Sequence, residues 1–381
     1  MLLSGLRVLD LSRVLAGPLC TMLLGDLGAD VLKVERPLTG DETRGWGPPF
    51  DARGESAYYL SVNRNKLSVA ADLDRDEDVE LVRRLAAEAD VVVENYRPGA
   101  LARRGLDAAT LLARHPRLIW CTISGFGATS ARPGYDFVVQ AERGWMAITG
   151  EPDGAPMKAG VAIVDVLTGK DAAIAVLAAL VARGRSDAPL PVADRQLHVS
   201  LAASAAAGLV NVAQNALVSG HEGGRWGNAH ANLVPYQLFD AADRPLVVAV
   251  GNDAQWRACA HALDLPALAA DPRLATNPGR LAHRAELTTA LAAQLRTRPA
   301  AEWLERLERV GVPAGQVKGV LEVLAEAGGS PLTGMPPSVP GRVRRPPPQR
   351  DEQGEAIRRG GWKCFEEYAS GRDASGEGAS E

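Results

Sequence analysis

The stretch LRVLDLSRVLAGPLCTMLLGDLGADVLKV (residues 6–34) determines the fold class. Residues 6–11 form a short apolar run typical of a buried strand, and Gly17-Pro18 opens an apolar segment of helical length that continues to Leu27. Gly28 supplies a stop for that helix, and residues 30–34 form the next short apolar strand. The sequence therefore opens with a strand, a helix and a second strand in about thirty residues, which is typical of a βαβ unit.

The same alternation continues along the first half of the chain. We expect a helix over 81–89 and strands over 90–94 and 118–123. Short apolar strands that alternate with helices predict an α/β fold with a doubly wound, largely parallel, Rossmann-like sheet covered on both faces. Two Ala-rich stretches, 169–183 and 199–218, are apolar nearly all round, which is typical of helices buried centrally or in an oligomer interface.

A change of composition over residues 220–227, which include four glycines, marks a domain boundary. We expect a large α/β domain over 1–219 and a smaller α/β domain over 220–327. The Pro-, Gly- and Arg-rich residues 328–369 are predicted to form an arm that returns to the large domain. The small and polar residues 370–381 are predicted to form a disordered tail.

Composition and charge exclude several classes of function. The 381 residues include 42 basic and 46 acidic side chains, and this net charge of −4 gives no support for binding to nucleic acid or to an anionic membrane. The four cysteines form no CxxC pair and the six histidines no HExxH motif, so we expect no bound metal and no disulfide framework. No run of about 18 uninterrupted apolar residues occurs, and we expect a soluble, cytoplasmic protein.

Carboxylates and basic side chains remain as the chemical groups of interest. The chain has no GxxxxGK[ST] loop and no GxSxG motif, and Ser124-Gly125-Phe126-Gly127 is only a weak match to a dinucleotide-binding loop. Asp165 lies in an otherwise apolar run over 159–169, where a carboxylate is costly unless it is hydrogen-bonded or functional. The pattern alone allows two readings, an N-cap of the following helix or a reactive group.

Six short segments in a fixed order carry a family resemblance. They are Asp10-Leu11-Ser12-Arg13-Val14-Leu15-Ala16-Gly17-Pro18, Gly28-Ala29-Asp30-Val31-Leu32-Lys33-Val34-Glu35-Arg36-Pro37, Asn63-Arg64-Asn65-Lys66, Glu94-Asn95-Tyr96-Arg97-Pro98-Gly99-Ala100, Ser124-Gly125-Phe126-Gly127 and Gly134-Tyr135-Asp136-Phe137. With these segments the chain resembles the class III CoA-transferases, the family of formyl-CoA and carnitine CoA-transferases, from Leu3 to about Val317.

The resemblance implies a substrate, a nucleophile and a set of binding residues. Acyl-CoA and a carboxylic acid are the implied substrates, with no tightly bound cofactor. Asp165 matches the family's catalytic aspartate, whose carboxylate attacks the thioester and forms a mixed anhydride. Gly160 and Gly169 are expected to let backbone approach the substrate and to offer N–H donors. The positions that match the family's CoA-binding residues are Arg13, Leu15, Ala16, Arg36, Lys66, Asn95, Tyr96, Arg97, Ala100 and Arg103.

Two other functions fit the same scaffold. An α-methylacyl-CoA racemase would need an acid–base pair, but it resembles this chain with a histidine at the place of Tyr135, so we rank transfer above racemisation. A non-catalytic CoA-binding protein is the second alternative. Because members of the family are interlocked homodimers, the resemblance also implies that this chain pairs with a second copy of itself.

Overall fold

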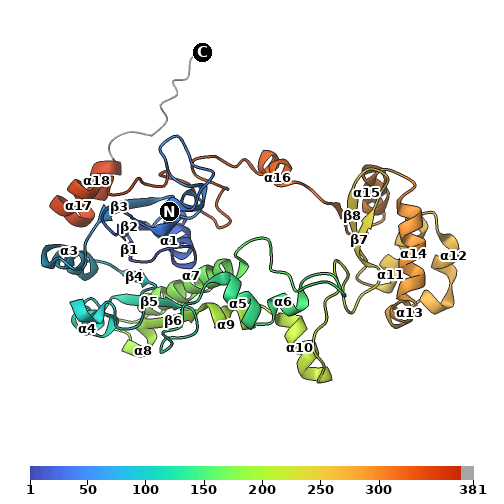
Figure 1. Cartoon of the computed structure of the whole chain (residues 1–381), viewed down its shortest axis with the longest axis horizontal. Coiled ribbons are helices and arrows are strands. Elements are labelled where there is room, and N and C mark those ends of the chain that lie inside the picture. The colour runs from blue at the N-terminus through green and yellow to red at the C-terminus, as the bar shows by residue number, and fades with distance from the viewer. Residues whose placement is uncertain (370–381) are drawn as a thin grey trace, which may run out of the picture. The chain divides into compact units, whose positions relative to one another are not determined.

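The computed structural model describes residues 1–369, so the tail predicted to be disordered at 370–381 lies outside the described residues. The chain divides into two units, whose elements are labelled in Figure 1. Unit 1 contains Met1–Trp145, Lys158–Gly220 and the chain from Ala327 onward, and unit 2 contains Met146–Met157 and His221–Glu326. Residues 146–157 thus belong to the second unit, whereas the predicted boundary placed them in the large domain.

A six-stranded parallel sheet forms the centre of unit 1. Its strands pair in the order β3-β2-β1-β4-β5-β6, and every pairing is parallel. The chain runs outward from β1 to β3 and then returns to the other side of β1 with β4, so the order reverses between β1 and β4. The α/β fold with a parallel sheet is confirmed. The strands are β1 (Arg7–Asp10), β2 (Asp30–Glu35), β3 (Lys66–Ala70), β4 (Val91–Glu94), β5 (Ile119–Ser124) and β6 (Gln196–Ser200).

Successive strand residues face two separate hydrophobic cores, as the pleat of a sheet requires. Val8 of β1 lies in the core formed with α1 (Ala16–Asp26), α7 (Ile163–Gly184) and α9 (Leu201–Ala207). Its neighbour Leu9 lies in the opposite core. The helices that contribute to this second core are α3 (Asp76–Ala87), α4 (Ala108–Arg114), α17 (Gly354–Gly360) and α18 (Cys364–Ala369). Helices therefore cover both faces of the sheet, which explains why its strands read as continuous apolar runs.

Two helix predictions need correction. Helix α7 begins at Ile163 rather than at residue 169, so Asp165 lies inside its first turn. The stretch 199–218 is not one helix: it begins in β6, continues as α9, and ends as α10 (Val210–Ser219). Among the described residues no single helix is long and apolar enough to cross a bilayer, although α9 and α10 together, bent by 68°, pass the same test of length and composition.

The C-terminal residues of unit 1 pack along the β3 edge of the sheet. The backbone N–H of Ser68 in β3 donates to Gln353, and Asn65 accepts from the backbone N–H of Arg344 at 2.6 Å. The remaining short elements of the chain before residue 221 are η1 (Glu42–Gly45), α2 (Ala57–Leu60), η2 (Ala102–Arg104), α5 (Asp136–Glu142), α6 (Trp145–Ile148) and α8 (Val192–Arg195), and η4 (Gly361–Lys363) follows α17.

Unit 2 is built on a three-stranded antiparallel sheet with the order β7-β8-β9. Its strands are β7 (Tyr236–Asp240), β8 (Pro245–Ala249) and β9 (Ala314–Gln316). The core contains two fully buried tryptophans, Trp256 and Trp303. The helices of this unit are α11 (Asp253–Ala262), α12 (Pro266–Ala270), η3 (Pro272–Leu274), α13 (Asn277–Ala282), α14 (Arg284–Leu295), α15 (Ala300–Arg309) and α16 (Val320–Ala327).

Candidate active site

Asp165 lies in the first turn of α7 with 8% of its surface exposed. The capping role that the sequence allowed for it is taken by another carboxylate, because Asp136 accepts hydrogen bonds from the backbone N–H of Val164 at 2.7 Å and of Asp165 itself at 3.3 Å. No hydrogen bond from residues 1–369 reaches the Asp165 carboxylate. This side chain is thus a buried acid that is left without a structural partner.

Burial raises the pKa of Asp165 to about 7, and the nearby carboxylate of Asp136 contributes in the same direction. Burial disfavours the charged form because a carboxylate loses its hydration, and a second negative charge adds repulsion. An acid with a pKa near 7 is ionised in about half of the molecules at neutral pH. Perturbed carboxylates of this kind are concentrated at catalytic sites.

Asp165 faces a pocket of unit 1 at the carboxyl ends of β1, β4 and β5, beside the place where the strand order reverses. Ligands of open α/β sheets bind at such a place. Most of the other lining residues belong to three loops, which follow β1, β4 and β5 respectively, and Glu42 and Leu201 complete the lining. The predicted binding residues that line this pocket together with Asp165 are Arg13, Leu15, Ala16, Asn95, Tyr96 and Arg97.

The remaining predicted binding residues lie elsewhere. Arg36 is exposed and lines a smaller hollow, which it shares with Arg13 and Tyr96. Ala100 and Arg103 line neither of these two hollows, although Arg103 is exposed on the same stretch of chain after β4.

The prediction that Lys66 binds CoA needs correction, because its ammonium is buried inside unit 1. It forms an ion pair with Asp10 at 2.9 Å and donates to the carbonyl of Pro18 and to Asn63 at the same distance. All three protons of the ammonium therefore have protein acceptors. Burial by itself would raise the pKa of Asp10. The charges of Lys66 and Lys33 outweigh this effect and lower the pKa of that carboxyl to about 2. Lys66 belongs to the structural network below the pocket and is not available to a ligand.

Of the two glycines near Asp165, Gly169 has a packing role that the sequence did not predict, and the role of Gly160 stays a prediction. Gly169 lies inside α7, one turn after Asp165, and a Cβ at this position would lie 2.6 Å from the carbonyl oxygen of Ala16. Its lack of a side chain lets α7 approach the start of α1 closely, so it serves helix packing. A Cβ at Gly160 would meet open space within 4 Å.

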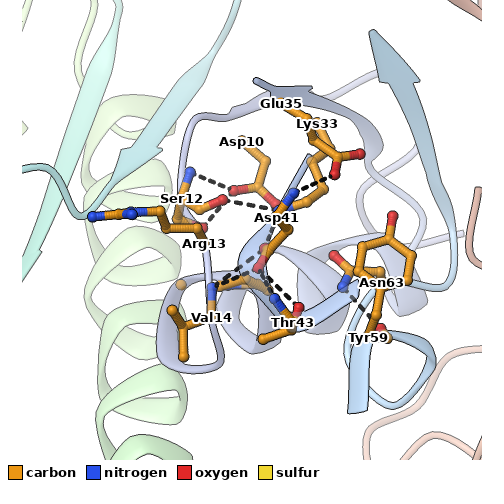
Figure 2. Close-up of polar contacts among 12 residues, drawn as sticks. Asp10, Ser12, Arg13, Val14, Lys33, Glu35, Asp41, Thr43, Tyr59 and Asn63 are labelled. Atoms are coloured by element: carbon orange, nitrogen blue, oxygen red, sulfur yellow. Dashed lines mark hydrogen bonds and ion pairs between the residues drawn. The ribbon is translucent and has the colours of Figure 1, made fainter. Parts of the chain in front are cut away.

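Side chains from other elements hold the loop after β1 at several points, and Figure 2 shows two of them, Lys33 and Asp41. Asn95 accepts from the N–H of Arg13 at 3.1 Å and donates to its carbonyl at 2.8 Å. Val14, the next residue, has a φ of 71°, which is rare for a β-branched residue and costs on the order of 1–3 kcal/mol. Its N–H donates to the buried carboxylate of Asp41 at 3.2 Å. Leu15 and Ala16, which follow, line the pocket.

Sequence reasoning considered Tyr135 only as the place of the racemase histidine, and it did not single out Arg132 or Tyr58. Arg132 and Tyr135 line the pocket beside Asp165, and Tyr135 is 52% exposed. Tyr58 lies close by, since burial and then the charge of Asp165 raise its pKa to about 12, and its ring contacts Trp46 edge-on with centroids 5.0 Å apart. The segment from Gly134 to Phe137 was a signal for Tyr135, whereas the sequence offers no comparable signal for Tyr58.

The comparisons with known proteins agree with this geometry. The family model described as CoA-transferase family III matches residues 3–330. The chain belongs to CoA-transferase family III. It is 44% identical over 332 residues to a succinate–glutarate CoA-transferase of Agrobacterium fabrum, a match that covers 85% of this chain and 82% of the relative.

Two further comparisons extend the match. The human succinyl-CoA:glutarate CoA-transferase is 43% identical over 327 residues, which are 85% of this chain and 73% of the human protein. A crystal structure of a CaiB/BaiF family protein from Brucella suis is 41% identical, with a TM-score of 0.80 over 94% of this chain and 98% of the other. The predicted family and the predicted activity, CoA transfer, are confirmed.

Proposed function

We propose that Asp165 is the nucleophile of the transfer reaction and that it forms an aspartyl–acyl anhydride. The observation that supports this role is a buried carboxylate without a hydrogen-bond partner among residues 1–369, facing a pocket lined by arginines and loop backbone. One Asp165 oxygen attacks the thioester carbonyl, the C–S bond breaks, and CoA leaves as thiolate. An anhydride conserves the activation of the thioester, which hydrolysis would lose.

Balanced transfer of CoA to a second acid then needs three exchanges at the same carboxylate. The CoA thiolate attacks the aspartyl carbonyl and releases the first acid, leaving an aspartyl thioester. The acceptor carboxylate attacks that thioester, which frees CoA again and gives a new anhydride. The thiolate finally attacks the acceptor's carbonyl, which yields the new acyl-CoA and restores the Asp165 carboxylate. Every step exchanges one acyl bond for another.

CoA is proposed to lie over the ends of β1, β2 and β4. Tyr96 contributes to both hollows and offers a ring on which adenine can stack. Arg36 and Arg97 provide exposed guanidinium groups on either side of it, and phosphate is a good partner for both.

Short dicarboxylic acids are the proposed acceptors and, as thioesters, the proposed donors. The names of the Agrobacterium and human relatives specify succinate or succinyl-CoA together with glutarate. Such an acid presents one carboxylate to the reaction and a second one to the protein. Arg13 and Arg132 line the pocket that Asp165 faces, and each is paired with a glutamate, Glu42 and Glu142 respectively. We propose that one of them exchanges this partner for the second carboxylate of the substrate.

An interlocked homodimer in the cytoplasm completes the proposal. Helix α10 exposes Leu217 and Val218 by 78% and 79%, and α7 exposes Ile174 by 64%. Exposed apolar side chains on these two helices of unit 1 suit a large obligate interface. The four cysteines are buried and free, which suits a reducing compartment.

Substitution of the nucleophile tests the proposal. Asp165→Ala should abolish CoA exchange between succinyl-CoA and glutarate and leave CoA binding, measured by calorimetry, within about threefold of wild type, since the nucleotide contacts lie elsewhere. Asp171→Ala is the matched control, because Asp171 is an exposed acid on the same helix, bonded to Ser204. Hydroxylamine added during turnover should convert Asp165 of the wild-type protein to a hydroxamate that peptide mass spectrometry detects.

Each alternative has its own outcome in this experiment. Transfer that persists in Asp165→Ala would remove the nucleophile from the proposal. CoA binding without transfer in the wild-type protein would indicate a non-catalytic CoA-binding protein. Exchange of the α-proton of a 2-methylacyl-CoA with solvent deuterium would indicate a racemase.

A further inference from the structure

A buried acid outside the pocket holds the most strained residue of the pocket's first loop. Asp41 is 3% exposed. It does not line the hollow that contains Asp165, but it lines the smaller one with Arg36 and Tyr96. Its carboxylate accepts the N–H of Val14 and both the N–H and the hydroxyl of Thr43, and it forms an ion pair with Lys33 at 3.0 Å (Figure 2). Four groups of three residues converge on this carboxylate, so its position is fixed from several directions.

The strained residue that Asp41 holds is connected directly to the site of reaction. A residue in a sparsely populated backbone conformation keeps it only where its surroundings impose it. Here the N–H of Val14 is held by Asp41, and the residue before it is held on both sides by Asn95. The next two residues, Leu15 and Ala16, line the pocket with Asp165, and α1 begins at Ala16. Rotation of Val14 to a negative φ would redirect these residues.

Lys33 links the same carboxylate to the backbone of the loop a second time. Its ammonium donates to the carbonyl of Ser12 at 2.9 Å as well as to Asp41. Burial opposes ionisation of both groups, but their mutual attraction raises the pKa of Lys33 and lowers that of Asp41. The pair thus stays charged, and it fixes the loop at residues 12 and 14 together.

We propose that Asp41 is a positioning residue of the transfer reaction, which holds the Val14 turn and thereby orients the start of α1 toward Asp165. This proposal rests on the proposed role of Asp165. The Asp41 carboxylate is occupied by Val14, Thr43 and Lys33, so its contribution lies in the geometry of the loop. Its removal should lower kcat more than it raises the KM for acyl-CoA, because Arg36 and Arg97, which are proposed to bind the phosphates, are not part of the Val14 turn.

A double-mutant cycle separates this role from a merely structural one. Asp41→Asn keeps the size of the side chain, removes its charge, and should lower kcat about tenfold or more, since small displacements in a site cost that much. In Val14→Gly the positive φ carries no steric penalty, so the same Asn substitution should then cost less than about threefold. Equal losses in both backgrounds would overturn the proposal.

Asp26→Asn is the matched control variant. Asp26 is also fully buried and ion-paired, to Arg64 at 2.7 Å, but it lies at the other end of α1. It should lower thermal stability as Asp41→Asn does and leave kcat within about twofold. A loss of kcat in Asp26→Asn as large as in Asp41→Asn would reduce the effect to general destabilisation and overturn the proposal.

Hydrogen exchange provides a readout that needs no turnover. Asp41→Asn should speed amide exchange about tenfold or more in a peptide covering residues 11–18. Asp26→Asn should leave the exchange rate of the same peptide unchanged. Unchanged exchange in Asp41→Asn would overturn the positioning role even if activity falls. A wild-type protein that lacks transfer activity would defeat the proposed function instead, and the exchange rates would still decide whether Asp41 holds the loop.

Discussion

Replacing Asp165 by asparagine should make the folded protein more stable, and more so at alkaline than at acid pH. The folded protein raises the pKa of this carboxyl from its ordinary 3.8 to about 7, so it binds the proton more tightly than the unfolded chain does. Ionisation of Asp165 therefore destabilises the fold. The cost is absent below pH 3.8, grows between pH 3.8 and 7, and is complete above pH 7.

The size of the effect follows from the two pKa values. Each unit between them corresponds to about 1.4 kcal/mol, so the full cost is about 4 kcal/mol at pH 8 and about 2 kcal/mol at pH 5. An asparagine of the same size carries no charge. It also breaks no hydrogen bond, because none from residues 1–369 reaches the carboxylate. The free energy of unfolding of Asp165→Asn should therefore exceed that of wild type by about 4 kcal/mol at pH 8 and about 2 kcal/mol at pH 5.

Urea unfolding at pH 5 and pH 8 measures this gain. Wild type and Asp165→Asn are compared by the midpoint and slope of the transition, with Asp171→Asn as the control on the same helix. Asp171 is exposed, so loss of its charge should not produce a gain that grows with pH. An Asp165→Asn protein that is equally stable as wild type at both pH values, or less stable at pH 8, would show that the carboxylate is well solvated or bonded, and would refute the reasoning.

Three further predictions concern catalysis, binding and packing. In a pH–rate profile, the acid limb of kcat/KM for acyl-CoA should lie near pH 7. Asp136→Asn should move this limb to lower pH, because removal of the like charge lowers the pKa of Asp165. Arg36→Ala should raise the KM for acyl-CoA about tenfold and leave stability unchanged. Lys66→Met should instead lower stability by about 3–5 kcal/mol, because it leaves Asp10 buried without this partner. Steady-state kinetics measures the first effect and calorimetry the second. Gly169→Ala should lower both stability and kcat, because the added Cβ would lie 2.6 Å from a carbonyl of α1, and thermal melts with initial rates test it.

The central fold could be predicted because its signals are local. Each inner strand is a short apolar run next to a helix of contrasting period, and this pattern depends only on neighbours in the sequence. Strand β6 escaped prediction because it runs directly into the Ala-rich helix α9, so no glycine or proline separates the two. Propensity at such a junction is overridden by pairing with β5, which is distant in the sequence.

The site residues show the same division between local and distant causes. Asp165 could be singled out because a charge in an apolar run is unusual wherever the chain goes. Lys66 could not be placed, since its acceptor Asp10 lies 56 residues away and turns a presumed ligand contact into a buried ion pair. The left-handed backbone of Val14 has no signature in the sequence at all, because a β-branched residue is the least expected there.

The structure separates the task of capping α7 from the task of attacking a thioester, and this separation explains why Asp165 is costly. A carboxylate that caps a helix accepts backbone N–H groups, which lowers its pKa and occupies its lone pairs. Asp136 fulfils that task from α5, so both oxygens of Asp165 remain available to an electrophile. Because the cap itself carries a negative charge, it also keeps the pKa of its neighbour high. The stability lost at Asp165 and the reactivity proposed for it therefore have one physical origin, a buried charge with no partner.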